Sequence, residues 1–474
     1  GLSVIFRLPK PLISAPEAPT FATPRTFMEH RFAPASTHPT GPSVVHPEWS
    51  RSAAIYQINT RQFTPEGTFA AATEQLPRLA ELGVGIVWLM PVHEIGELNR
   101  KGKLGSPYAV RDYYSVSSEL GSEADLHAFI DKAHELGLHV IIDWVANHTS
   151  WDSVLREEHP EFYELDENGE PRPTMWWDWD DIVDLDFTVP AVADYMAEAM
   201  TYWVREFDVD GFRCDVAGFV PVWFWARVRR ELEEIKPVFM LAEWESRELH
   251  DDAFDMTYAW TWNTIMHRIA SGKDGLEPLR EYYAWNDRAY ARDSIRMQFV
   301  SNHDMNSWVG TEYERFGDGL ESIIVLSFIS DGMPLVYNGQ EAGNERRLDF
   351  FDRDPIEWSE HPMGEFYRQL IAVKSATSAL DNGAWGGRMI EVKTSDREEV
   401  LAFARSTSDD AVLAIFNLSA SPREVELLSG PFEGSWRPIP VVGERKATGG
   451  DVVDLATGAT VSLPAWGWAA YQRA

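Results

Sequence analysis

Short apolar runs alternate with longer amphipathic segments over most of the chain, from about residue 51 onward. The short runs are continuously apolar, which is typical of parallel strands that are covered on both faces. The longer segments, such as FAAATEQLPRLAELG ending at Gly83, repeat their apolar residues at helical spacing. The pattern predicts eight strands, at residues 53–59, 85–92, 138–145, 210–216, 238–244, 254–259, 296–302 and 334–340.

Eight strands with mostly helical connections favour an α/β fold with a closed (β/α)8 TIM barrel over residues 48–384. A doubly wound open sheet is the alternative, but no glycine-rich phosphate-binding motif follows the first strand. Residues 1–47 are rich in Pro, Ser, Thr and Ala and predict an extended N-terminal arm. From residue 385 short strands alternate with turn residues, which predicts a C-terminal antiparallel β-domain, a β-sandwich, over 385–474.

One connection, residues 149–186, shows no helical pattern and carries several tryptophans among many carboxylates. It follows the third predicted strand and therefore lies at the carboxyl end of the barrel, where barrel active sites lie. A long connection without regular structure inside a compact domain is usually functional. We therefore predict that this inserted segment contributes to a site.

The charge balance narrows the choice of partners. The chain has 474 residues with 42 Lys and Arg against 75 Asp and Glu, a net charge of −33. Such an acidic protein is a poor match for nucleic acid or an anionic membrane, and it suits a neutral substrate. No apolar run reaches the roughly 18 residues of a membrane span. The single cysteine, Cys214, excludes an intramolecular disulfide and is predicted to be a small buried apolar residue.

The segment Gly211–Asp215 is the most informative part of the chain. Arg213 and Asp215 are two residues apart on a predicted strand, so their side chains lie on the same face. An adjacent guanidinium favours the ionised form of a carboxyl, and an ionised Asp at a strand end can act as a nucleophile. A purely structural ion pair is the alternative interpretation of this fragment alone.

Polar residues follow several predicted strands and would converge at one rim of the barrel. They are Asp143, Asn147 and His148 after the third strand, Arg213 and Asp215 after the fourth, Glu243 after the fifth, and Asn302, His303 and Asp304 after the seventh. Three carboxylates, two histidines and an arginine at the same end of a barrel are hard to explain by stability, whereas a single carboxylate there would indicate nothing. The pattern indicates a catalytic site.

Two carboxylates that flank a bond are the requirement for glycoside hydrolysis, and a retaining pair is about 5–5.5 Å apart. Neighbouring strands are about 4.8 Å apart, so the ends of the fourth and fifth strands meet this requirement. Asp215, beside Arg213, suits the nucleophile. Glu243 lies between Ala242 and Trp244, where desolvation would raise its pKa and suit it to general acid/base work.

These motifs resemble those of a known family. DWVANH, GFRCDVAG, LAEW and FVSNHD, in this order, resemble the four short signature regions of the α-amylase family, glycoside hydrolase family 13. GVGIVWLMPV, SPYAVRDYYSV and VDLDF resemble the second-strand region, the loop after it and a motif near the end of the inserted B domain. The resemblance covers roughly residues 50–474. It implies a TIM barrel with a short inserted B domain and a C-terminal β-domain.

The resemblance also implies catalytic roles. Asp215 would be the nucleophile that forms a β-glucosyl-enzyme, and Glu243 would be the acid/base. Asp304 would stabilise the distorted sugar and the transition state. Arg213 would hold Asp215 in position.

The remaining implied residues would bind the substrate. His148 and His303 would contact the sugar at the cleavage subsite. Tyr108 would stack on that sugar, with packing at the barrel rim as the alternative. Trp244 would form a platform on the acceptor side, with a structural role as the alternative, and Asp143 is expected to be a structural residue near the site.

The chain departs from the family pattern after the nucleophile. Many calcium-dependent members carry Lys and His there, and this chain has Gly218 and Phe219. Asn147 matches the position of a family calcium ligand, and the inserted segment offers further carboxylates, Asp178, Asp180 and Asp181. The chemistry implies no cofactor, and no metal-ligand set is assigned. A structural calcium, held by oxygen ligands, stays open.

The resemblance implies a retaining α-1,4-glucan hydrolase of the α-amylase type, acting on starch or maltooligosaccharides. A cyclomaltodextrinase, a maltogenic amylase or an α-glucosidase is the alternative within the family. A non-catalytic glucan-binding protein is a remote alternative, because such proteins typically lose catalytic carboxylates. An acidic, starch-acting enzyme whose chain begins with Gly rather than Met favours a secreted or periplasmic location over the cytoplasm.

Overall fold

Eight parallel strands close into a barrel. The computed structural model describes residues 44–447 and 449–474, so most of the predicted N-terminal arm, 1–47, lies outside the described residues. The strands are β1 (Ile55–Ile58), β2 (Ile86–Leu89), β5 (His139–Trp144), β8 (Gly211–Cys214), β9 (Phe239–Ala242), β10 (Met256–Tyr258), β11 (Ile295–Gln298) and β12 (Met333–Tyr337). Their order is β1-β12-β11-β10-β9-β8-β5-β2. Each overlaps one predicted strand, so the predicted barrel is confirmed and the open sheet is excluded.

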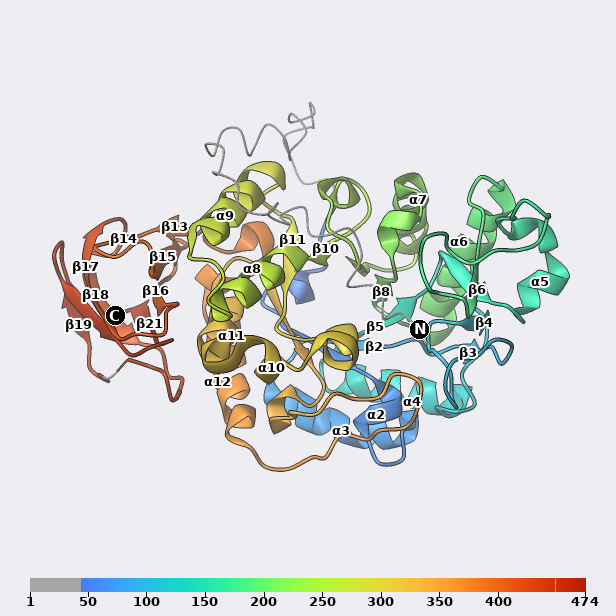
Figure 1. The fold of residues 1–474 in the computed structure, drawn as a ribbon, viewed down its shortest axis with the longest axis horizontal. Coiled ribbons are helices and arrows are strands. Elements are labelled where there is room, and N and C mark those ends of the chain that lie inside the picture. Colours follow the sequence, from blue (N-terminus) through green and yellow to red (C-terminus); the bar gives the residue numbers. More distant parts are fainter. Residues whose placement is uncertain (1–43, 448) are drawn as a thin grey trace.

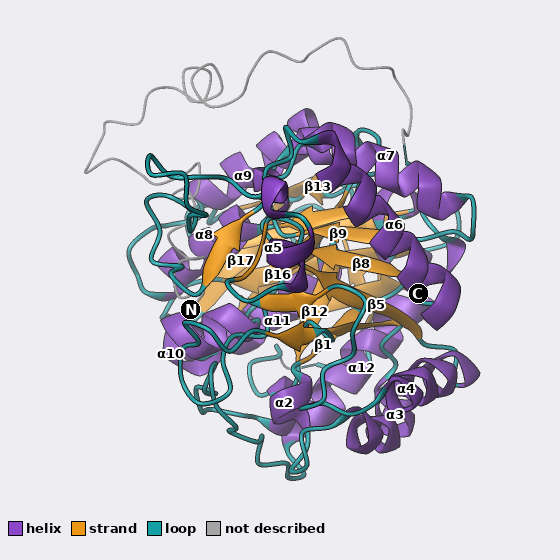
Figure 2. Cartoon of the chain, turned by 90° about the vertical axis from the view of Figure 1, so that its right-hand side faces the viewer, coloured by secondary structure: helices purple, strands orange, loops and turns teal. Residues whose placement is uncertain are grey.

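Helices surround the strands (Figure 2). The main ones are α3 (Phe69–Leu82), α4 (Glu123–Glu135), α6 (Pro190–Phe207), α7 (Val222–Glu233), α8 (Trp260–Ala270), α9 (Glu277–Ala289), α11 (Leu320–Ile329) and α12 (Pro362–Ala376). Shorter ones are α2 (Thr60–Phe63), α5 (Val154–Glu158) and α10 (Glu312–Phe316). Local capping starts several of them; in α4, for example, Ser122 and Asp125 form a reciprocal capping box. The barrel strands are apolar on both faces because one face packs on these helices and the other fills the barrel.

The inserted segment extends from the carboxyl end of β5, at the opposite end of the molecule from the C-terminal sheets (Figure 1). It holds the antiparallel pair β6 (His148–Ser150) and β7 (Ile182–Asp184), and a smaller pair, β3 (Glu94–Ile95) and β4 (Val110–Asp112), precedes it in the chain. The expectation that residues 149–186 contain no helix was wrong for α5. That helix starts at an N-cap formed by Ser153 and has five residues, which is too short to produce a periodic pattern.

The C-terminal part consists of antiparallel strands. Six strands form one sheet in the order β13-β15-β16-β21-β18-β19, and three form another in the order β14-β17-β20. The two sheets share one apolar core. The strands are β13 (Ile390–Glu391), β14 (Lys393–Thr394), β15 (Val400–Ser406), β16 (Ala411–Asn417), β17 (Arg423–Ser429), β18 (Gly434–Pro438), β19 (Val453–Leu455), β20 (Thr460–Leu463) and β21 (Trp468–Arg473).

Cys214 is buried in β8, and burial raises the pKa of its thiol well above the usual value, in keeping with its predicted apolar role. Among the residues that the structure describes, no helix combines the length and apolar character that a membrane span needs.

Candidate active site

The register of three neighbouring strands brings the predicted residues together. Asp143 on β5 pairs with Arg213 on β8, and Cys214 on β8 pairs with Ala242 on β9. The residues that follow this last pair, Asp215 and Glu243, therefore leave adjacent strand ends. Parallel strands are about 4.8 Å apart, so the two carboxyl groups lie side by side at the rim of the barrel.

The guanidinium of Arg213 is the centre of this cluster. Its Nη1 atom donates to Asp215 Oδ1 at 2.8 Å and to Asp143 Oδ1 at 3.0 Å. Its Nη2 atom lies 3.0 Å from Glu243 Oε2, and its Nε atom donates to the hydroxyl of Tyr258 at 3.1 Å. All of these side chains are buried. One buried arginine thus makes charge-assisted hydrogen bonds to two carboxyl groups and an ion pair with a third.

The backbone turns sharply directly after Asp215. Val216 has a φ of +36°, in the left-handed region that a β-branched residue rarely adopts. In this conformation its N–H donates to Glu243 Oε1 at 2.8 Å. Strained backbone of this kind persists only where the surroundings enforce it, and it concentrates at functional sites. The turn therefore links the end of β8 to the carboxyl group that follows β9.

Burial changes the protonation of the two carboxyl groups. Burial raises the pKa of Glu243 to about 7, although Arg213 opposes the shift. Burial also raises the pKa of Asp215 well above its usual value, the negative charge of Glu243 adds to this, and Arg213 acts against both. From the sequence only the opposing effect of Arg213 could be predicted. Once Glu243 holds a proton, its charge no longer disfavours ionisation of Asp215, so the protonation states of the two carboxyl groups are coupled.

Tyr108 and His303 form a second part of the cluster. Gln57 Nε2 donates to His303 Nδ1 at 2.6 Å, which leaves the proton on Nε2, 3.0 Å from the hydroxyl of Tyr108. That hydroxyl donates to Asp143 Oδ2 at 2.7 Å. The two rings stack at 5.4 Å with an interplanar angle of 17°. Burial lowers the pKa of His303 well below its usual value, so the imidazole is neutral.

His148 and Asp304 complete the set of residues at the rim. His148 begins β6 and accepts a hydrogen bond from Asn147 Nδ2 at 3.0 Å, and burial lowers its pKa to about 3. Burial raises the pKa of Asp304 well above the usual value. Asp215 Oδ2 and Asp304 Oδ1 are buried oxygens without a hydrogen-bond partner among the described residues. Buried polar atoms are rarely left unpaired, and a bound ligand with hydroxyl groups would satisfy them.

Three contributors to the cluster, Gln57, Trp88 and Tyr258, were not predicted from the sequence. Asp143, expected to be a structural residue near the site, accepts from Trp88 Nε1 at 3.0 Å, and Arg213 lies over the Trp88 ring at 4.9 Å. Of these three residues, only Gln57 could have been recognised in the sequence, because it is a single polar residue inside an otherwise apolar strand.

The structure does not bring together the carboxylates that the sequence offered as ligands of a structural calcium. Within residues 44–447 and 449–474 no group of three or more His, Cys, Asp and Glu side chains is placed to hold a metal ion. Asn147 Nδ2 also lies 3.5 Å from Asp184 Oδ1, and burial raises the pKa of Asp184 to about 6. Asp180 pairs with Lys101 at 3.0 Å. No calcium site is assigned to the residues around Asn147, and no chemical step is derived through a metal.

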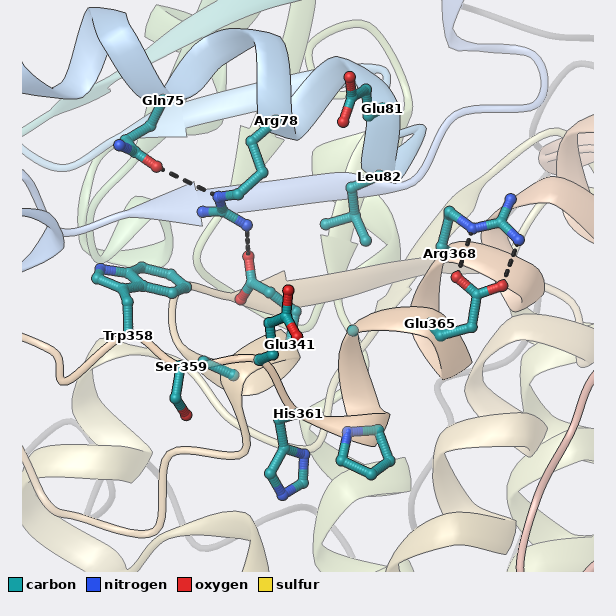
Figure 3. A pocket seen from close by; sticks show the side chains of 14 residues that line it. Gln75, Arg78, Glu81, Leu82, Glu341, Trp358, Ser359, His361, Glu365 and Arg368 are labelled. Carbon is teal, nitrogen blue, oxygen red and sulfur yellow. Dashed lines mark hydrogen bonds and ion pairs between the residues drawn. The ribbon is translucent and has the colours of Figure 1, made fainter.

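A separate pocket of about 770 Å³ lies on the outside of the barrel, between α3 and the start of α12 (Figure 3). Its wall includes Arg78, which is paired with Glu341 at 3.0 Å and lies over the ring of Trp358 at 4.5 Å. The second arginine, Arg368, is paired with Glu365. Both arginines of this pocket are therefore already paired with a carboxylate. The pocket is separate from the cluster around Arg213, because none of the residues of that cluster lines it.

A closed barrel with two neighbouring carboxyl groups at the carboxyl ends of its strands is the arrangement that barrel-fold glycoside hydrolases use. The family model of the α-amylase catalytic domain matches residues 31–412 of this chain. The α-amylase MalA of Haloarcula japonica is 28% identical over 401 residues, which cover 81% of this chain and 58% of that protein. The chain therefore belongs to the α-amylase family of glycoside hydrolases, whose chemistry needs no cofactor.

Solved structures agree with this assignment. The maltogenic α-amylase AmyB of Thermotoga neapolitana is 32% identical with a TM-score of 0.76, over 89% of this chain and 96% of that one. An α-amylase of Lactobacillus plantarum is 29% identical with a TM-score of 0.77, over 90% of this chain and all of that one (100%). The similarity thus extends over most of the chain.

Proposed function

We propose that this protein is a retaining α-1,4-glucan hydrolase of the α-amylase type, acting on starch or maltooligosaccharides. The observation that carries the proposal is the single guanidinium of Arg213 that holds both Asp215 and Glu243. Their adjacent strand ends match the separation of about 5–5.5 Å that a retaining pair needs. Their coupled protonation states allow one acid and one nucleophile at the same pH.

The reaction follows from these roles. Asp215 Oδ2, which has no hydrogen-bond partner among the described residues, attacks the anomeric carbon while Glu243 gives its proton to the departing glycosidic oxygen. Glu243, now ionised, then takes a proton from water, whose oxygen attacks the same carbon and releases Asp215. Asp304, Tyr108 and the neutral imidazoles of the rim would bind the sugar during both steps. Two inversions at one carbon leave the α configuration unchanged.

The products of hydrolysis test this proposal directly. We expect proton NMR, recorded within the first minutes of the digestion of maltoheptaose, to show the α-anomer of the new reducing end before mutarotation. Chromatography of a soluble-starch digest should show mixed intermediate oligosaccharides early in the reaction. First formation of the β-anomer would rule out the retaining mechanism.

A cyclomaltodextrinase or maltogenic amylase is the second candidate function. It is favoured by the similarity to a solved maltogenic α-amylase over 89% of this chain. Incubation with β-cyclodextrin separates the two candidates. Opening of the ring faster than the digestion of starch, or maltose as the main early product, would select the second.

The pH dependence of the activity should follow the protonation of Glu243. We expect kcat/KM on maltooligosaccharides to fall as the pH rises through about 7, because burial places the pKa of this carboxyl at about 7 and the acid is lost above it. At the acid end, protonation of Asp215 removes the nucleophile and the activity falls again. A kcat/KM profile measured across the neutral range checks this, and the absence of an alkaline limb near pH 7 would contradict the role of Glu243.

A further inference from the structure

Residues 44–50, which we call the strap, cross the amino end of the barrel. Trp49 stacks on His139, the first residue of β5, at 3.9 Å with an interplanar angle of 4°. Its ring also lies 6.0 Å from that of Phe239, the first residue of β9, and packs against the apolar cluster inside the barrel. The strap therefore closes the end of the barrel that lies opposite the catalytic rim.

One histidine anchors the first half of the strap. His46 Nδ1 lies 2.6 Å from Oδ1 of Asp255, which directly precedes β10, and His46 Nε2 lies 2.6 Å from the backbone oxygen of Asp293, just before β11. The His46 side chain is only 7% exposed, so water has little access to these contacts. The second half of the strap is held differently, because Asn382 Nδ2 donates to the backbone oxygen of Ser50 at 2.8 Å. The docking of the first half therefore depends on a group that can titrate.

The two partners of His46 determine its protonation. A backbone oxygen can only accept a hydrogen bond, so Nε2 carries a proton. Asp255 Oδ2 accepts from the backbone N–H of Met240 at 2.6 Å and from Arg229 Nη1 at 2.7 Å, and these donors favour the ionised carboxylate. An ionised carboxylate also only accepts, so Nδ1 carries a proton as well. His46 is therefore an imidazolium that uses both of its N–H groups.

The charged groups that face His46 agree with this protonation state. Burial lowers the pKa of His46, but the hydrogen bond and charge of Asp255, together with Asp293, outweigh burial and raise it above 6.5. Arg229, on α7, brings a positive charge to the same carboxylate at 2.7 Å. His250, from the segment between β9 and β10, adds no charge, because burial lowers its pKa to about 3. The negative charge of Asp255 is thus shared by one arginine and one imidazolium.

We propose that the strap is a pH-sensitive plug of the barrel, docked by the imidazolium of His46 and released when His46 loses a proton. A neutral imidazole has one N–H, so either the Asp255 carboxylate or the Asp293 backbone oxygen would then lack its donor. Because docking raises the pKa of His46, docking is strongest below about 6.5, the value of a free histidine, and weakens as the pH rises through the raised value. The plug therefore opens on the alkaline side, and this inference does not depend on the proposed hydrolysis.

Hydrogen exchange of the full chain, followed by mass spectrometry, measures the docking of the strap. The N–H groups of Ser50 and Arg51 donate to the backbone oxygens of Pro47 and Glu48, so their exchange reports on this segment. For the wild type we expect their protection factors to fall about tenfold or more between pH 6 and pH 9, after correction for intrinsic exchange. A hydrogen bond to a charged group contributes roughly this factor.

Two variants assign this pH dependence to a residue. His46→Gln has no titrating group at this position and cannot donate to both partners, so we expect low protection of the strap already at pH 6 and no further fall up to pH 9. His127→Gln, on α4, is the matched control. The ring of His127 stacks on Phe207 and has no carboxylate partner among the described interactions, so this variant should keep the wild-type profile. The thermal unfolding midpoint shows whether each variant is folded.

Two results would overturn the plug. Protection of the strap that stays constant between pH 6 and pH 9 in the wild type would do so, whether or not His46→Gln folds. An equal fall in the wild type and in folded His46→Gln would assign the effect to another group, such as His134, which pairs with Asp210 at 2.7 Å. Neither result bears on the proposed hydrolysis, whose alkaline limb belongs to Glu243 at the opposite end of the barrel and should persist in His46→Gln.

Discussion

Asp215→Asn should reduce kcat/KM on maltooligosaccharides by on the order of 10⁵-fold, because the amide cannot form the covalent intermediate. The replacement preserves shape, and the amide oxygen can still accept from Arg213 Nη1, which now donates at 2.8 Å. Arg213 also keeps its contacts to Asp143 and Glu243. The fold should therefore survive, and the loss should appear in kcat and not in the unfolding midpoint.

The variant Asp210→Asn is a matched control for Asp215→Asn. Asp210 precedes β8 and bonds to His134 and Lys236, far along the strand from the rim. Asp210→Asn should lower the unfolding midpoint and leave kcat within a small factor. Wild-type activity in Asp215→Asn would show that another group is the nucleophile.

The stereochemistry of azide rescue gives an independent check on Asp215. In Asp215→Gly, azide can occupy the space of the lost carboxylate and attack the anomeric carbon of α-maltosyl fluoride from the same side as Asp215. The product should be the β-azide, with inverted configuration. Formation of the α-azide would place the missing group on the other face of the sugar and contradict the assignment of Asp215.

Glu243→Gln should reduce glucan hydrolysis by about 10³-fold, the contribution typical of a general acid. The same variant should form the glycosyl-enzyme from α-maltosyl fluoride at close to the wild-type rate, since fluoride leaves without a proton. The alkaline limb near pH 7 should also disappear, because burial of this one carboxyl raises its pKa to about 7. Burst kinetics on the fluoride and a pH profile on glucan measure the two effects.

Glu245 supplies the control for this variant. Its side chain, two residues further along the chain, is 9% exposed, but it bonds to Arg296 and Thr261 and makes no contact with Arg213 among the described interactions. Glu245→Gln should lower stability and keep the pH profile. If Glu243→Gln lost equal activity on glucan and on the fluoride, Glu243 would not be the acid.

Some features of this protein follow from local sequence. The barrel strands could be predicted because parallel strands covered on both faces must be continuously apolar, and β8 shows this directly. Polar residues just past such strands meet at one rim, so Asp215, Glu243 and Asp304 could be grouped from the sequence alone. The short helix α5 could not be predicted, because five residues carry no period.

Other features depended on contacts between residues far apart in the chain. The sequence determined which side chains reach the rim, because the alternation of strand and helix sets that locally. Only the tertiary structure decided that Gln57 orients His303, that Asp143 shares the guanidinium of Arg213, and that burial outweighs this guanidinium at Asp215. Only the tertiary structure, likewise, placed the backbone of Gly218 against the indole of Trp244. Desolvation and ring packing depend on everything that surrounds a group, and residues from distant segments supply most of those surroundings.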